Sequence, residues 1–143
     1  MKVLLDTNVV LDVLLEREPF VEAAAGLLAR AEGGSVVGWV GATTVTTIHY
    51  LATKVVGAAR ARAAITSLIS ILRVAPVTQA VIEASLASPL VDFEDAVLLE
   101  AARACGAHAI VTRDPRDFAA SDLPVYDPRQ LLAILRSEEA TQR

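Results

Sequence analysis

Short apolar runs alternate along the chain with longer segments in which apolar residues recur at helical spacing. Four runs have the length of a β-strand and a fifth is weaker; they cover residues 2–5, 35–40, 71–75 and 107–112, and then residues 123–126. These runs are almost continuously apolar, which is typical of strands that are buried on both faces of a sheet. The pattern therefore predicts a sheet with helices on both sides.

The segments between the runs have the apolar spacing and the end signals of helices. We predict helices at residues 8–16, 19–32, 43–55, 58–70, 78–87, 92–105 and 127–136. In the first of them, Val9, Val10, Val13 and Leu14 fall on one face. Gly106 follows the sixth and is a typical helix stop.

Strands that alternate with helices in this way form a parallel sheet. The expected fold is α/β, a three-layer α/β/α sandwich with a central parallel sheet of four to five strands. No linker or repeat interrupts the pattern, so residues 1–136 are expected to form a single domain. Residues 137–143 are polar and are expected to form a frayed C-terminal tail.

The chain is unusually apolar for a soluble domain, since 54% of its 143 residues are hydrophobic and its mean hydropathy is +0.49. No stretch is long enough to cross a bilayer, so we expect the apolar excess to serve the core and a homodimer surface. Asp6 interrupts the first apolar segment too early for a signal peptide. The single Cys105 permits no internal disulfide, which favours a reducing, cytoplasmic location without membrane association.

The formal net charge of −4 argues against a protein that simply coats nucleic acid, because such proteins carry a basic excess. The chain has 17 acidic and 13 basic residues, and two bound divalent cations would cancel the difference of four. An acidic chain is therefore compatible with a phosphate substrate once metal ions are bound.

Aspartates stand at three boundaries between predicted strands and helices. Asp6 closes the first strand, Asp114 closes the fourth, and Asp95 lies in the opening turn of the helix at residues 92–105. In a parallel sheet, strand ends and the starts of the returning helices share one edge, so the three carboxylates should converge. Clustered carboxylates repel one another unless divalent cations bind between them. The pattern indicates metal-assisted chemistry, with phosphate as the expected target.

Each of these acids also has a purely structural interpretation as a helix cap. Asp114 precedes Pro115 and has the pattern of an N-cap followed by a first-turn proline. Asp92 is placed to cap the helix that carries Asp95, and Asp6 or Thr7 to cap the first helix. Capping alone does not explain why an acid ends two apolar strands.

Three segments of this chain resemble the PIN domain, and their order and spacing resemble the toxin ribonucleases of VapBC-type, type II toxin–antitoxin pairs. The segments are Leu4-Leu5-Asp6-Thr7-Asn8-Val9, Asp92-Phe93-Glu94-Asp95-Ala96, and Val111-Thr112-Arg113-Asp114 with Asp117-Phe118. The resemblance implies a compact α/β/α domain, Mg²⁺- or Mn²⁺-dependent cleavage of RNA, and a small antitoxin protein as partner.

The resemblance also implies roles for individual residues. Asp6, Asp95 and Asp114 match the metal-binding acids of the family, and Asn8 and Thr112 match residues that support them. A glutamate that the family usually carries after the second strand is replaced here; the best alignment puts Thr47 at its position, with Asp92, Glu94 and Asp117 as further sources of negative charge.

Basic residues and histidines add weaker signals. Arg113, Arg116 and Lys54 are expected near the acids, either to hold substrate phosphates or as ordinary solvated side chains. His49 and His108 lack partners at zinc-ligand spacing. We expect His108 to be structural and His49 to face either the core or the acidic crevice.

The function expected from these observations is a Mg²⁺- or Mn²⁺-dependent endoribonuclease that acts on single-stranded or looped RNA. Two alternatives stay open. One is a PIN-like binding module that has lost cleavage together with the glutamate, and the other is a metal-dependent nuclease or phosphatase on a different phosphate substrate.

Overall fold

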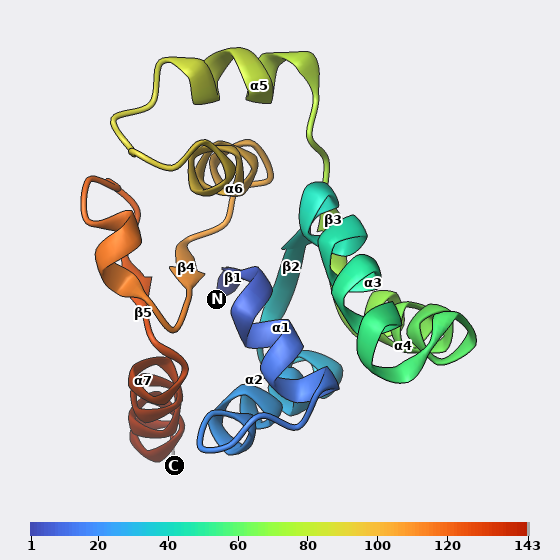
Figure 1. Ribbon diagram of the computed structural model, residues 1–143. Helices are drawn as coiled ribbons and strands as arrows, with labels where there is room; N and C mark the ends of the chain where they lie inside the picture. Colours follow the sequence, from blue (N-terminus) through green and yellow to red (C-terminus); the bar gives the residue numbers. More distant parts are fainter. Residues whose placement is uncertain (143) are drawn as a thin grey trace.

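The computed structural model describes residues 1–142, and at its centre is a parallel five-stranded sheet of order β3-β2-β1-β4-β5 (Figure 1). The strands are β1 (Lys2–Leu5), β2 (Val37–Gly41), β3 (Arg73–Ala75), β4 (Ala109–Val111) and β5 (Val125–Tyr126). Every neighbouring pair is parallel. The predicted α/β fold with a parallel sheet is confirmed.

Helices cover both faces of this sheet. They are α1 (Thr7–Leu14), α2 (Val21–Glu32), α3 (Ala42–Val56), α4 (Ala58–Ile71), α5 (Gln79–Leu86), α6 (Phe93–Ala104) and α7 (Pro128–Thr141), with a short 3₁₀ helix η1 (Pro115–Phe118) between β4 and β5. Figure 1 shows α5 and α6 together on one side and α1, α2 and α7 on the other.

The central strand β1 is buried on both faces because its side chains alternate between two separate cores. Val3 and Leu5 pack into the core formed with α1, α2, α4 and α7, whereas Leu4 packs into the core under α5 and α6. The neighbouring strand β4 divides its side chains in the same way, with Ile110 on the α6 side. This arrangement explains why these strands read as continuous apolar runs.

Glycines in β2 let helices approach the sheet closely. A Cβ atom on Gly38 would lie 2.4 Å from Leu72 Cδ2, and one on Gly41 would lie 2.6 Å from Leu98 Cδ2. A side chain at either position would force the leucine beside it to shift; Leu72 follows α4 and Leu98 lies in α6. Gly41 also ends β2 beside the start of α3.

The expectation of a frayed tail from residue 137 is wrong for most of that segment. Helix α7 begins with a capping box between Asp127 and Gln130 and continues to Thr141. Its polar last turns are held to α2 by a two-pronged ion pair between Arg30 and Glu139. A contact to another helix therefore stabilises residues that carry no apolar signal, while residue 143 lies outside the described residues.

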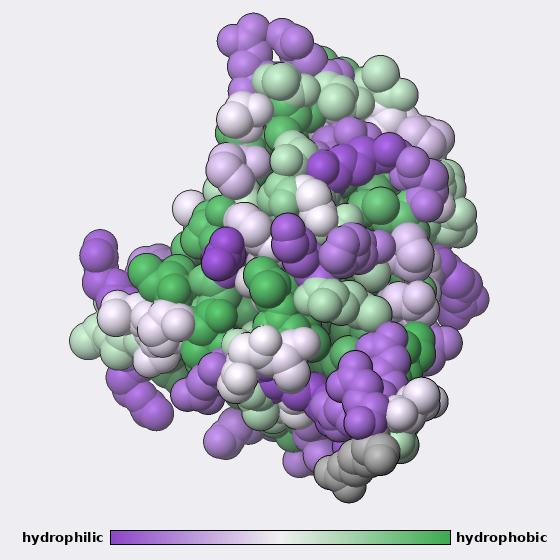
Figure 2. Space-filling view, turned by 180° about the vertical axis from the view of Figure 1, so that it is seen from behind, coloured by the Kyte–Doolittle hydropathy of each residue, from purple (hydrophilic) through white to green (hydrophobic). Residues whose placement is uncertain are grey.

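Several large apolar side chains of the described residues stay exposed. They are Met1, Phe20, Tyr50, Val55, Ile69, Val74, Leu86, Val91 and Phe93. Figure 2 shows hydrophobic patches between polar groups on the face opposite to the view of Figure 1. None of the helices in residues 1–142 combines the length and the apolar character that a membrane span requires.

Candidate active site

The carboxyl ends of the parallel strands lie along one edge of the sheet, and ligands bind at this edge in such folds. The ends of β1 and β4 are in register, with Leu5 opposite Val111, and the backbone N–H of Asp6 donates to Val111 O at 2.8 Å. Asp6 and Thr112 therefore leave the two central strands side by side. The start of α6 carries Asp95 to the same edge.

Asp6 is held by hydrogen bonds to both of its carboxylate oxygens. Oδ1 accepts from the backbone N–H of Thr7 at 2.7 Å, which makes Asp6 the N-cap of α1. Oδ2 accepts from the hydroxyl of Thr112 at 2.8 Å. The same hydroxyl accepts from the backbone N–H of Asp114 at 3.1 Å. Thr112, which is fully buried, thus fixes two acids with one side chain.

Asn8 bridges the same groups from the first turn of α1. Its Nδ2 atom lies 3.5 Å from Asp6 Oδ2, 3.4 Å from Asp114 Oδ2 and 3.3 Å from Thr112 Oγ1. Its Oδ1 atom accepts from the backbone N–H of Arg113 at 3.2 Å. The amide therefore stands between two carboxylates, and the structure brings Asp6, Asn8, Thr112 and Asp114 together as the sequence predicts.

Asp95 faces this cluster from α6. Its pKa is raised to about 7, first by burial and then by the negative charges of Asp6, Asp92, Asp117 and Glu94, in that order. Asp95 is therefore close enough to these acids for their charges to disfavour its own ionisation.

The pKa of Asp6, which faces Asp95 across the cluster, is also raised. Burial raises its pKa, while the hydrogen bonds from Thr112 and Thr7 oppose that rise. The charges of Glu94 and Asp114 then raise the pKa of Asp6 further. The charge of Asp6 in turn raises the pKa of Asp95, so acids that lie far apart in the sequence form a crevice with unbalanced negative charge.

The capping interpretations are correct for two of the acids and wrong for the third. Asp92 Oδ1 accepts from the backbone N–H of Asp95 at 2.9 Å and caps α6, and Asp6 caps α1. Asp114 precedes η1 without making a side-chain cap. Its carboxylate is instead oriented toward Asn8, so capping does not account for this acid.

The oxygen-rich cluster has the donor chemistry that hard divalent cations prefer. Within residues 1–142, no three His, Cys, Asp or Glu side chains stand close enough together to form a ready-made metal site. The mutual repulsion that raises the pKa of Asp95 is nevertheless the effect that a bound cation would offset. The donor chemistry of these residues therefore fits a divalent cation.

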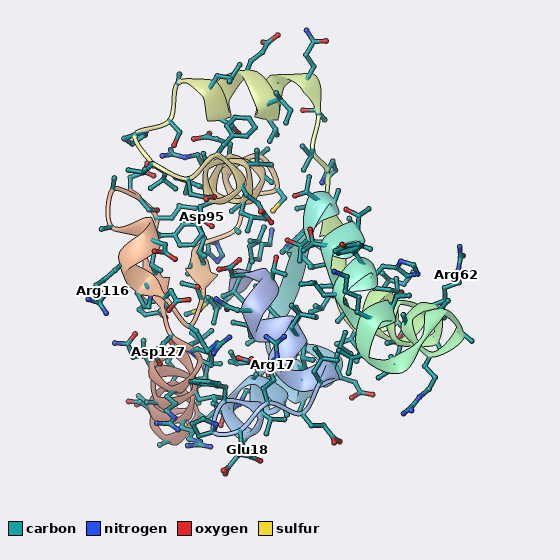
Figure 3. All side chains as sticks on the ribbon, in the orientation of Figure 1. Arg17, Glu18, Arg62, Asp95, Arg116 and Asp127 are labelled. Carbon is teal, nitrogen blue, oxygen red and sulfur yellow. The ribbon has the colours of Figure 1, made fainter. Side chains whose placement is uncertain are left out.

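A cavity of about 350 Å³ opens beside the acids, between the start of α6 and η1. It is lined by Pro89, Leu90, Val91, Asp92, Asp95, Arg116, Asp117, Ala119 and Ala120. Figure 3 shows Arg116 extending outward from the segment between β4 and β5, near Asp95 at the start of α6. Of the three basic residues singled out in the sequence, Arg116 is the one that lines this cavity.

Lys54 is not brought to the acids. It lies in the last turn of α3, twelve residues after Ala42, which corresponds to about 18 Å along the helix axis. The start of α3, not its end, adjoins the carboxyl edge of the sheet. The ammonium group of Lys54 packs over the ring of Tyr50 at 4.3 Å from the centroid.

The side chain of Arg113 points away from the cavity beside Asp95. Its Nε atom lies 3.0 Å from Asp12 Oδ2, and its guanidinium carbon lies 4.1 Å from the centroid of the Phe20 ring. Arg17 approaches the same carboxylate at 4.0 Å. Burial raises the pKa of Asp12, and the charges of Arg113 and then Arg17 oppose that shift.

Sequence analysis missed Asp12, although a signal for it exists. The predicted helix at residues 8–16 places Asp12 one turn after Asn8, beside a face that should be buried. An acid at such a position needs a partner of opposite charge. The partner, Arg113, is far away in the sequence, so periodicity alone does not identify it.

Thr47, aligned with the glutamate of the family, makes a local bond only. Its hydroxyl donates to the backbone O of Thr43 at 3.1 Å within α3. The threonine that reaches α1 is the buried Thr44, whose hydroxyl accepts from Thr7 Oγ1 at 3.1 Å. No acid lies in the first turn of α3, so this helix contributes hydroxyl groups where the family contributes a carboxylate.

The two histidines lie away from the acids. His108 Nδ1 accepts from the backbone N–H of Lys2 at 3.0 Å, before the first residue of β4 and at the opposite edge of the sheet. His49 lines a groove of about 390 Å³ between α3 and α4, together with Arg62 and Ile65. The expected structural role of His108 is thus supported, and His49 faces neither the acids nor the fully buried core.

Comparison with known families identifies one match, which covers most of the chain. The profile described as PIN domain matches residues 2–116, a range that contains Asp6, Asp95 and Asp114. No curated protein matches the chain significantly in sequence.

Solved structures of similar fold include toxin–antitoxin proteins. VapBC2 from Rickettsia felis, bound to a promoter DNA fragment, aligns over 89% of this chain and 98% of its own with a TM-score of 0.69 and 13% identity. DNA-bound VapBC from Salmonella typhimurium aligns over 90% and 98%, with a TM-score of 0.67 and 22% identity. VapC20 from Mycobacterium tuberculosis, a Sarcin-Ricin loop cleaving toxin, aligns over 82% and 94%, with a TM-score of 0.67 and 20% identity.

Proposed function

Since the chain belongs to the PIN domain family, we propose that it is a Mg²⁺- or Mn²⁺-dependent endoribonuclease and the toxin of a toxin–antitoxin pair. The observation that carries the proposal is the convergence at one sheet edge of Asp6, Asp95 and Asp114. Asn8 contacts the first and the last of these acids, and the charge of Asp6 disfavours the ionisation of Asp95. A similar fold belongs to a toxin that cleaves the Sarcin-Ricin loop, which supports RNA as the substrate.

In this proposal Asp6, Asp95 and Asp114 hold the divalent cation, and Asp92, Glu94 and Asp117 add negative charge around it. The bound cation would supply Lewis-acid activation of a water molecule and stabilisation of the leaving oxygen. Carboxylates must be ionised to bind metal, so metal binding would release a proton from Asp95, whose pKa is about 7 without metal.

The other residues of the site orient these acids and receive the substrate. Thr112 and Asn8 hold Asp6 and Asp114 at a fixed separation through the hydrogen bonds of the strand ends. Arg116 lines the cavity beside Asp95 and is placed to hold a phosphate of the RNA. A cavity that is open at the sheet edge admits an exposed backbone more readily than a paired one, so single-stranded or looped RNA is the proposed substrate.

An antitoxin protein and a second copy of the chain are the proposed partners. Structures of similar fold are toxin–antitoxin complexes from Rickettsia felis, Klebsiella pneumoniae and Salmonella typhimurium. The groove between α3 and α4 and a second groove between α2 and α7 provide surface for a protein segment. Exposed apolar side chains such as Tyr50 and Val55 provide surface for a homodimer.

The proposal is tested by incubating the purified protein with single-stranded RNA in Mn²⁺, in Mg²⁺ and in a chelator. Cleavage is expected only with metal, and duplex DNA, single-stranded DNA and a phosphomonoester serve as the substrate panel. Metal-dependent hydrolysis of one of these substrates in place of RNA would replace the ribonuclease with another phosphate-directed activity.

A second candidate function is a binding module without cleavage, and the specific observation in its favour is Thr47. A neutral hydroxyl that bonds within its own helix is a poor substitute for a metal-ligating glutamate. A folded protein that cleaves none of the substrates at any metal concentration, yet binds RNA or an antitoxin, would support this alternative.

A further inference from the structure

We propose that Asp12 is a positioning residue for the acidic site, which it serves by holding the side chain of Arg113 and thereby fixing the turn that carries Thr112 and Asp114. The proposal rests on the proposed function insofar as this turn contributes to a metal site. Asp12 itself lies outside the group of acids that face Asp95.

Two residues of helix α1, Asn8 and Asp12, contact Arg113, and they are one helical turn apart. Near its start, Asn8 Oδ1 accepts from the backbone N–H of Arg113 at 3.2 Å. One turn further on, Asp12 Oδ2 lies 3.0 Å from Nε of the same residue. Residues four apart lie on the same face of a helix, so α1 presents both groups to one neighbour. The backbone and the side chain of Arg113 are thus held by a single rigid element.

These contacts affect the acidic site because of the position of Arg113 in the sequence. Arg113 stands between Thr112, which bonds Asp6, and Asp114, which faces Asn8. The segment has left β4 and has not yet entered η1. The backbone N–H of Thr112 still donates to Tyr126 O in β5 at 3.0 Å, and Asp114 O accepts from the backbone N–H of Asp117 at 3.0 Å. The ion pair of Arg113 with Asp12 adds an anchor between these two bonds and thereby limits the movement of the acid that follows.

The surroundings of Arg113 restrict its guanidinium to this one orientation. The ring of Phe20 covers it at 4.1 Å, and cation–π packing of this kind favours a fixed position over a solvated one. The carboxylate of Asp12 is completely buried, so it cannot turn to water in place of Arg113. Arg17 stands farther away, at 4.0 Å, on the other carboxylate oxygen.

Stability alone does not account for an ion pair at this place. A buried ion pair is often no more stabilising than two apolar side chains of similar size, because both charges lose their water. An apolar pair would fill the same space but would lack the electrostatic attraction that keeps Nε of Arg113 within 3.0 Å of the Asp12 carboxylate. This attraction is the property that an apolar replacement removes, and the difference makes the proposal testable.

The test compares the parent with the double variant Asp12→Leu/Arg113→Met, which replaces the ion pair by an apolar pair and leaves no unpaired buried charge. Its melting temperature should stay within a few degrees of the parent value. Mn²⁺ affinity, measured by calorimetry, should fall about tenfold, as is usual when a group that orients metal ligands is removed. Hydrogen exchange at the backbone amides of Arg113 and Asp114, which donate to Asn8 and Thr112, should become at least about tenfold faster.

Two variants serve as controls. Arg17→Met removes the more distant arginine and leaves the contact to Arg113 in place, so it should change neither metal affinity nor exchange at residues 113 and 114. The pair Arg30→Met/Glu139→Met removes an ion pair between α2 and α7, away from the acids, and should likewise change neither quantity. Exchange at Ile110 within β4 reports on the fold itself and should stay constant in all variants.

The outcomes separate this proposal from the proposed function. Weaker Mn²⁺ binding together with faster exchange at residues 113 and 114 supports the positioning role. Unchanged exchange at these amides in the folded double variant overturns it, whatever the metal affinity. If the parent binds no Mn²⁺, the metal-dependent function fails, and hydrogen exchange alone still decides whether Asp12 fixes the turn. Should the double variant not fold, Asp12→Glu, which keeps the charge and shifts its position, is measured in its place with the same criteria.

Discussion

The hydroxyl of Thr112 donates a hydrogen bond of 2.8 Å to Asp6, so the ends of strands β4 and β1 are joined by side chains as well as by the sheet. This bond opposes the burial that raises the pKa of Asp6. The buried hydroxyl therefore favours the ionised form of Asp6.

Thr112→Val should weaken metal binding and reduce cleavage, because Asp6 loses the bond that favours its charged form and the backbone N–H of Asp114 loses its acceptor. The variant should also lose about 1 kcal/mol of stability, since two partly buried partners lose a hydrogen bond. Metal titrations of cleavage and denaturant melts measure both effects. Thr66→Val, at an exposed threonine that bonds within α4, is the matched control and should behave like the parent.

Asp6→Asn and Asp95→Asn should each abolish RNA cleavage and leave the fold intact. An amide of the same shape can still accept the bond from the backbone N–H of Thr7, so α1 keeps its cap. It cannot replace the charge of a ligand to a hard cation. Cleavage rates and thermal melts on the same preparations test this, and a folded variant that cleaves at the parent rate would remove that acid from the site.

The metal-free protein should become less stable as the pH rises through neutrality. The pKa of Asp95 is about 7 in the fold and 3.8 ordinarily, so the folded chain holds this proton where the unfolded chain has released it. The stabilisation is present below pH 3.8 and is lost as the pH approaches 7. Asp6, whose pKa is also raised, acts in the same direction.

Thermal melts in a chelator between pH 5 and 8 measure this dependence. Asp95→Asn should flatten it and raise the melting temperature at pH 8, whereas Glu32→Gln, at an exposed carboxylate at the end of α2, should leave the curve unchanged. Mn²⁺ should stabilise the parent most at the higher pH, where the carboxylates are ionised. Identical pH profiles for the parent and Asp95→Asn would contradict the prediction.

Thr47→Glu should shift the metal titration of cleavage to lower concentrations, because it restores a carboxylate at the position aligned with the glutamate of the family. The threonine is only half-buried and its hydroxyl bonds within α3, so the larger side chain displaces no contact to another element. Thr46→Glu adds the same charge at an exposed neighbouring position and is the control. Equal metal requirements for the parent and the folded Thr47→Glu variant would show that the alignment is wrong or that Asp92 already fills the role.

The protein should form a homodimer at micromolar concentration. Fully or largely exposed apolar side chains, including Leu86, Val91 and Val55, would otherwise be a liability for aggregation. Light scattering that gives the mass of two chains supports the prediction, and a clean monomer contradicts it.

The sequence predicts the sheet and most helices because strands buried on both faces leave an unmistakable apolar pattern. The acids of the site could also be found, since the carboxyl ends of parallel strands share one edge whatever the details of packing. Asp6, Asn8, Thr112 and Asp114 lie together for this reason. Their grouping follows from topology, which the pattern of strands and helices already contains.

Features that depend on one specific pair of side chains were not predictable in this way. The last turns of α7 read as a polar tail because their partner, Arg30, lies on another helix. The turn of Arg113 toward Asp12 and Phe20 depends on packing between α1 and the segment after β4. Lys54 was expected at the acids from its helix alone, but its distance from the start of α3 places it elsewhere.

The bond between Thr112 and Asp6 joins residues that are 106 positions apart in the sequence. Contacts of such long range form late in folding, because the chain between them must first be organised. During synthesis the N-terminal half leaves the ribosome with Asp6 but without β4, so it cannot yet assemble the acidic edge. A truncated chain that stops before Ala109 would lack the strand that completes this edge. Any nuclease activity is thus expected only in chains whose synthesis has passed β4.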